Sequence, residues 1–155
     1  MDRSRRSALK AGGSVGVMAV LIAASLLRPG FALAQQRNEV AFSMKSLVDA
    51  MKSLGAPVPA SSDAILITAP TIAENGAAVP VAVESKLPGT ESILLLIEKN
   101  PTPLAAMFGI PSGTQASIST RVKMGQSSDL YALVKAGDKY FVAKQEIKIV
   151  LGGCG

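Results

Sequence analysis

Apolar positions recur with two different periods along the chain, and the change falls near residue 57. Before that point, an apolar stripe at helical spacing predicts an amphipathic helix that Gly55 ends. The stripe consists of Met44, Leu47, Val48, Met51 and Leu54. The charged residues Lys45, Asp49 and Lys52 fall on the opposite face, so we expect the stripe to pack on a core rather than to dock a partner.

After Pro57 and Pro59 the pattern changes to short strands separated by turn residues. The predicted strands are 65–68, 79–84, 92–98, 116–123, 130–135, 139–143 and 146–151. In the last of them, Ile147 and Ile149 alternate with Lys148, which is typical of a strand with one buried face. About seven short strands at this spacing predict a mainly β fold, an antiparallel β-sandwich.

The first 34 residues have the pattern of an export signal. A basic stretch precedes an apolar run over residues 11–27, and Ala32-Leu33-Ala34 forms a cleavage site of A-x-A type. Arg5 and Arg6 lie in a segment that resembles the twin-arginine signal. We therefore expect cleavage after residue 34, export to the periplasm and no stable membrane insertion afterwards; an uncleaved amino-terminal anchor is the alternative.

The basic charge of the chain belongs mostly to this predicted signal. The 155 residues carry a formal net charge of +5, but five of the 16 basic and one of the 11 acidic residues lie in the first 34. The remainder has 11 basic and 10 acidic residues, a net charge of +1. With no basic stripe and no aromatic platform, the sequence argues against nucleic-acid binding.

Few catalytic chemistries are open to this composition. The chain has no histidine and one cysteine, which excludes a Ser-His-Asp or Cys-His pair and the usual zinc and copper sites. Its carboxylates are scattered beside lysines or in turns. We expect no catalytic residue, no metal site and no bound cofactor, so the chain is not expected to be an enzyme by itself.

The single cysteine, Cys154, stands in the sequence Gly152-Gly153-Cys154-Gly155. The predicted domain of residues 35–151 thus ends in a segment, 152–155, whose glycines allow a wide choice of backbone angles. An accessible thiol on such a flexible arm can enter the active site of another protein. An incidental cysteine in a frayed tail and an intermolecular disulfide are the alternatives.

Several segments resemble the SoxY family, the sulfur-carrying subunits of bacterial thiosulfate oxidation. They are ENGAAVPVAVES at 74–85, KNPTPLAAMF at 99–108, STRVKMGQSSDLYALVKAGDKYF at 119–141 and the terminal GGCG. The chain departs from the family pattern at Gly155, where that pattern has a second glycine. The resemblance implies an immunoglobulin-like sandwich with a carrier arm made of Gly152, Gly153 and Gly155 around Cys154.

The resemblance also implies partners and a covalent cargo. Cys154 would carry the intermediates as S-thiosulfonate and persulfide, within a heterodimer with a SoxZ-like subunit. A c-type cytochrome enzyme would couple thiosulfate to the thiol, a thiosulfohydrolase would remove sulfate, and a molybdenum-haem sulfane dehydrogenase would oxidise the outer sulfur.

Two other hypotheses remain beside the sulfur carrier. One is a structural periplasmic sandwich that uses Cys154 for a permanent intermolecular disulfide. The other is a small thiol-transfer enzyme, which would need an activating base that the sequence lacks.

Overall fold

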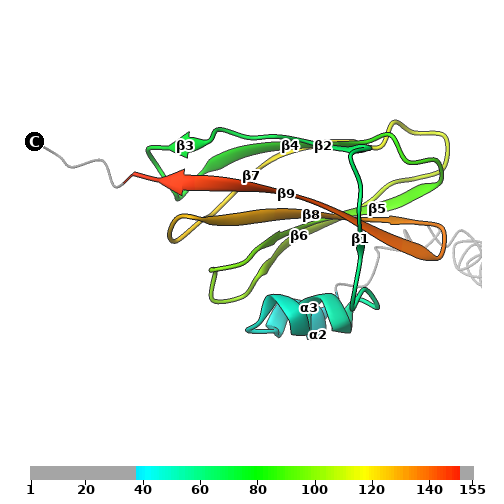
Figure 1. Cartoon of the computed structure of the whole chain (residues 1–155), viewed down its shortest axis with the longest axis horizontal. Helices are drawn as coiled ribbons and strands as arrows, with labels where there is room; N and C mark the ends of the chain where they lie inside the picture. The colour runs from blue at the N-terminus through cyan, green and yellow to red at the C-terminus, as the bar shows by residue number, and fades with distance from the viewer. Residues whose placement is uncertain (1–37, 151–155) are drawn as a thin grey trace, which may run out of the picture. The chain divides into compact units, whose positions relative to one another are not determined.

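The computed structural model describes residues 38–150, which form two β-sheets and a pair of short helices (Figure 1). The helices are α2 (Glu39–Ser43) and α3 (Leu47–Ser53). The strands are β1 (Ala60–Ser61), β2 (Ile65–Thr68), β3 (Ile72–Ala73), β4 (Val79–Ser85), β5 (Thr90–Ile97), β6 (Leu104–Gly109), β7 (Ser117–Val122), β8 (Ser128–Ala136) and β9 (Lys139–Ile149).

The strands form a large and a small sheet. The large sheet has the order β1-β9-β8-β5-β6, with β3 also paired to β9, and the small sheet has the order β2-β4-β7. Most pairs are antiparallel, as predicted, but β1 and β3 pair with β9 in parallel. The chain therefore starts in the large sheet at β1, passes to the small sheet at β2, returns to the large sheet at β3 and enters the small sheet again at β4.

The main hydrophobic core lies between the two sheets. Val79, Val81 and Val83 of β4 pack there against the large sheet, and each is at most 1% exposed. Strand β5 is buried on both faces: Ile93, Leu95 and Ile97 belong to this core, whereas the residues between them face the other way. The alternation of buried valines with more exposed residues in β4 and the unbroken apolar run in β5 follow from these two positions.

A second core lies on the outer face of the large sheet, where α2 and α3 cover it (Figure 1). Its buried residues are Ala41, Ala50, Met51, Ala56, Leu94, Leu96, Leu104 and Leu133. The predicted single helix is wrong in detail. Asn38 and Ser46 each accept a hydrogen bond from a backbone N–H three residues on, so each begins a separate helix, and Val48 is exposed.

Three further differences concern the strands. The two strands predicted over 139–151 form one strand, β9, because its pairing with β8 continues without interruption. Strand β6 was not predicted, nor were the two-residue strands β1 and β3.

No helix within residues 38–150 is long and apolar enough to cross a membrane.

Candidate functional site

The predicted attachment site, Cys154, lies outside the described residues, together with Gly152, Gly153, Gly155, Arg5 and Arg6. The predicted signal over residues 1–34 lies outside them as well. The structure does describe the residues that lead into the predicted arm. We call residues 148–150, the last three of the described range, the arm root.

Hydrogen bonds hold the arm root on both sides. On one side, the N–H of Lys148 donates to the carbonyl of Thr71 at 2.9 Å, and the N–H of Val150 donates to the carbonyl of Ala73 at 3.0 Å. On the other side, the N–H of Ile149 donates to Oγ of Ser127 at 2.9 Å. Figure 1 shows β3 beside the end of β9. These hydrogen bonds hold the three residues of the arm root, the last of which, Val150, is four residues before Cys154 in the sequence.

Gly76 lies very close to the backbone of Met124, with the side chain of Ile149 from the arm root nearby. Its carbonyl accepts a 2.7 Å hydrogen bond from the N–H of Met124. A Cβ atom at this position would lie 2.3 Å from the carbonyl oxygen of Met124 and 3.2 Å from Cγ2 of Ile149. Such contacts are too short for any side chain, so the Asn75-Gly76 turn needs glycine at its second residue because of space.

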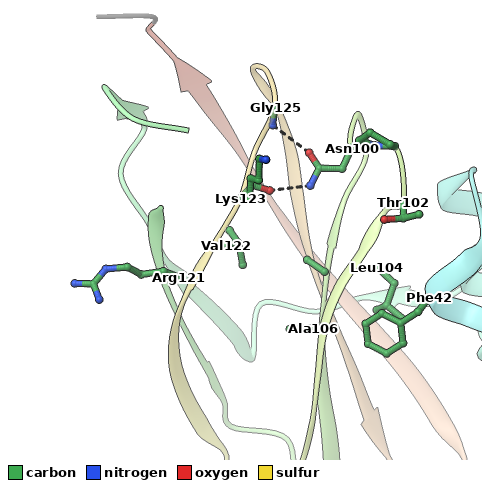
Figure 2. A pocket seen from close by; sticks show the side chains of 11 residues that line it. Phe42, Asn100, Thr102, Leu104, Ala106, Arg121, Val122, Lys123 and Gly125 are labelled. Atoms are coloured by element: carbon green, nitrogen blue, oxygen red, sulfur yellow. Dashed lines mark hydrogen bonds between the residues drawn. The ribbon is translucent and has the colours of Figure 1, made fainter. Parts of the chain in front are cut away.

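Asn100 connects the turn after β5 to the segment after β7 (Figure 2). Its Nδ2 donates to the carbonyl of Lys123 at 2.8 Å, and its Oδ1 accepts from the N–H of Gly125 at 3.2 Å. Both backbone groups follow an edge strand of the small sheet, whereas Asn100 follows a strand of the large sheet. One amide side chain therefore joins the two sheets at the end from which the arm root leaves.

Two open hollows meet at this end of the sandwich. The smaller one, of about 370 Å³, is lined by residues 74–77, by residues 123–125 and by Ile149. The larger one, of about 580 Å³, lies between the edge strands β6 and β7, with Phe42 of α2 at its side (Figure 2). Lys123 and Gly125 line both hollows. Within residues 38–150 no group of three or more His, Cys, Asp or Glu side chains is arranged to hold a metal ion.

Charged groups on β8 and β9 lie on the strands that lead to this end. Nζ of Lys144 lies 3.0 Å from Oδ2 of Asp129, and that carboxylate raises the pKa of the Lys144 ammonium. Partial burial, together with the nearby Glu98 carboxylate, raises the pKa of Tyr131. Near neutral pH Lys144 therefore stays a cation and Tyr131 stays a neutral phenol, so neither side chain provides a base or a nucleophile.

The segments around the arm root are those that carried the sequence resemblance. Residues 74–76, 99–103 and 123–125 were identified from the sequence only as turns or motifs. The structure places the first and last of these segments beside Ile149, and Asn100 bonds to the last. Sequence reasoning missed the contacts that Asn100 and Gly76 make with residues 123–125. The available signal was an asparagine at a turn, whose side chain can bond to backbone groups.

These features define a β-sandwich whose motif-bearing turns lie at the same end as residues 148–150, the arm root. The family model described as "Sulfur oxidation protein SoxY" matches residues 50–154. The solved structure of the sulfur carrier protein SoxY from Chlorobium limicola f thiosulfatophilum is 38% identical, with a TM-score of 0.62; the match covers 72% of this chain and 97% of that chain. No curated protein matched the sequence. The chain belongs to the SoxY family.

Proposed function

We propose that this chain is the sulfur carrier subunit of a thiosulfate-oxidising system and that Cys154 holds the intermediates covalently. The observation that carries the proposal is the membership of the SoxY family, with a match that extends to residue 154. Cys154 is also the single cysteine of the chain, and it follows the Gly152-Gly153 pair. Thiosulfonate and persulfide groups on cysteine are reversible modifications, as a carrier requires.

The proposed cycle begins with the oxidative attachment of thiosulfate. The Cys154 thiol would lose its proton and form an S–S bond to the outer sulfur of thiosulfate, and the two electrons released would pass one at a time to the c-type cytochrome enzyme and its electron acceptors. A thiosulfohydrolase would then use water to release the terminal sulfonate as sulfate, which leaves a persulfide. A molybdenum-haem sulfane dehydrogenase would take six electrons from the outer sulfur, whose three new oxygens come from water, and a second hydrolysis would release it as sulfate and restore the thiol. The chain itself provides only the thiol.

The number of residues between the arm root and Cys154 supports a carrier that provides the thiol and leaves catalysis to other proteins. Val150 is the last described residue, and Cys154 follows it by four residues. An extended chain spans at most about 3.3–3.6 Å per residue, so the thiol can reach roughly 13–14 Å beyond Val150. A thiol with that reach can be delivered into the active site of another protein.

The proposal includes a heterodimer with a SoxZ-like subunit and a location in the periplasm. Edge strands such as β6 and β7, with the 580 Å³ hollow between them, are surfaces that a partner protein can cover. The location rests on the predicted signal with Arg5 and Arg6. In this scheme the intermediates remain attached to one handle while several periplasmic enzymes act on it.

The decisive experiment is the intact mass of the protein purified from the periplasm, before and after reductant, with Cys154→Ser as the control. We expect the mature chain to lack residues 1–34 and to carry sulfur or thiosulfonate additions that reductant removes and the variant never shows. A bare thiol after incubation with thiosulfate and the partner enzymes would contradict the carrier function. A covalent homodimer that reductant merely separates would favour the structural disulfide instead.

A further inference from the structure

Two exposed large apolar side chains lie together at this end of the sandwich, one on β3 and one in the arm root. Ile72 of β3 is 58% exposed and Val150 is 50% exposed. In the parallel β3–β9 pairing Ile72 lies opposite Lys148, and Val150 is two residues further along the same face of the chain. Ala73 and Ile149, the next pair, turn the other way, toward the core. We call the exposed group of Ile72, Lys148 and Val150 the root patch.

We infer that the root patch is the contact surface for the enzymes that process the arm, and this inference rests on the proposed carrier function. The expected occupant is the rim of an active-site channel that offers an apolar side chain to Ile72 and Val150 and a carboxylate to Lys148. Lys148 is exposed and forms no ion pair with the residues that the structure describes, so its ammonium is available to such a carboxylate.

The length of the arm is the first argument for this occupant. Within the described residues the backbone is hydrogen-bonded as far as Val150, and four residues of sequence, Leu151 to Cys154, separate that point from the thiol. Because the thiol reaches at most roughly 13–14 Å from Val150, an enzyme with a recessed active site must bring its channel rim up to the end of β9. Whatever the chemistry of that enzyme, its rim then lies against the root patch.

The size of the patch is the second argument. A carrier that visits several enzymes in turn must leave each of them, so the shared contact has to be small and weak. Two half-exposed aliphatic side chains around one ammonium fit that requirement. A permanent subunit contact needs a much larger buried surface. The open edges of β6 and β7, with the 580 Å³ hollow between them, are a separate surface that remains available for that purpose.

The test compares the double variant Ile72→Glu/Val150→Glu with a matched control, Val48→Glu/Val58→Glu. The control also replaces two exposed apolar side chains by carboxylates, but in the helix layer and the loop after it. Each protein is prepared as the full complex with its partner subunit and loaded with the thiosulfonate group. The thiosulfohydrolase is then assayed by sulfate release at increasing carrier concentration.

We expect the KM for the root-patch variant to rise about tenfold with kcat within about twofold of the unmodified protein, because the lost contact precedes the chemistry. The control should keep both constants. The reaction of Cys154 with a small maleimide should proceed at the same rate in all three proteins, since that reagent needs no docking. Lys148→Ala should raise the KM by a smaller factor, and more at low salt than at high salt.

Three results would overturn the inference, and they are distinguishable. An unchanged KM in the root-patch variant, with normal loading, would remove the docking role and leave the carrier function intact. Loss of the heterodimer in native mass spectrometry would instead assign the patch to the subunit interface. Failure of the unmodified protein to accept any sulfur group would contradict the carrier function itself, and the root patch would lose its purpose with it.

Discussion

The helix layer and the arm-bearing end of the sandwich differ in how their parts are held together. In the helix layer, side chains of α2 and α3 pack against fully buried leucines such as Leu96 and Leu133. At the arm-bearing end, Gly76 and Asn100 hold three turns through backbone hydrogen bonds and one very short approach. Apolar packing responds to a substitution by degrees, whereas a close backbone contact leaves no room for adjustment.

The largest expected loss of stability is in the second core, between the helices α2 and α3 and the large sheet. Leu96 is fully buried, so Leu96→Ala should lower the free energy of unfolding by about 2–5 kcal/mol through the lost transfer energy and the cavity left behind. Urea unfolding measures this change. Leu66→Ala, at an exposed position of the small sheet, should cost under about 1 kcal/mol. Loading of Cys154 by the Leu96 variant, below its unfolding temperature, should be normal; a loss of loading would mean that the two regions are coupled.

A smaller loss of stability with a local effect on the arm root is expected from Gly76→Ala. The added Cβ meets the Met124 carbonyl, so the turn must shift, at a cost of about 1–3 kcal/mol. The N–H groups of Ile149 and Val150 should then exchange with solvent faster than in the unmodified protein. Gly125→Ala is the matched control, because nothing lies within 4 Å of a Cβ there. Equal exchange rates in the two variants would show that Gly76 does not position the arm root.

The smallest effect is expected at Asn100, whose side chain is partly exposed. Asn100→Ala removes the hydrogen bonds to the carbonyl of Lys123 and from the N–H of Gly125, at a cost of about 1 kcal/mol in unfolding free energy. Asn100→Asp keeps an acceptor for Gly125 but loses the donor to Lys123, so its stability should lie between those of the other two proteins. An Asp variant no more stable than the Ala variant would assign the stabilisation to the donor bond alone.

Local periodicity accounts for what could be predicted of the fold. Strand β4 has a clear alternation and β5 an unbroken apolar run, and both were predicted within a few residues. Strand β6 was missed because a register shift opposite Leu95 and Leu96 interrupts its period. As a result Leu104 and Met107 face the helix layer, whereas Ala106 and Phe108 face the main core. The prediction of a single helix was wrong for a related reason. The apolar stripe continues across Ser46, although this residue caps the start of a separate helix, α3.

The sequence by itself determined the chemistry: one thiol between glycines, no histidine, a first segment with the pattern of an export signal and a remainder with almost no net charge. These are properties of composition and order, and they do not depend on folding. Only the tertiary structure decided that Gly76 and Lys123 lie beside Ile149, that Asn100 bonds to Lys123 and that Ile72 lies exposed beside Val150. Those contacts depend on which strands pair and in which register, and pairing between residues far apart in the chain leaves no period in the sequence for a local pattern to reveal.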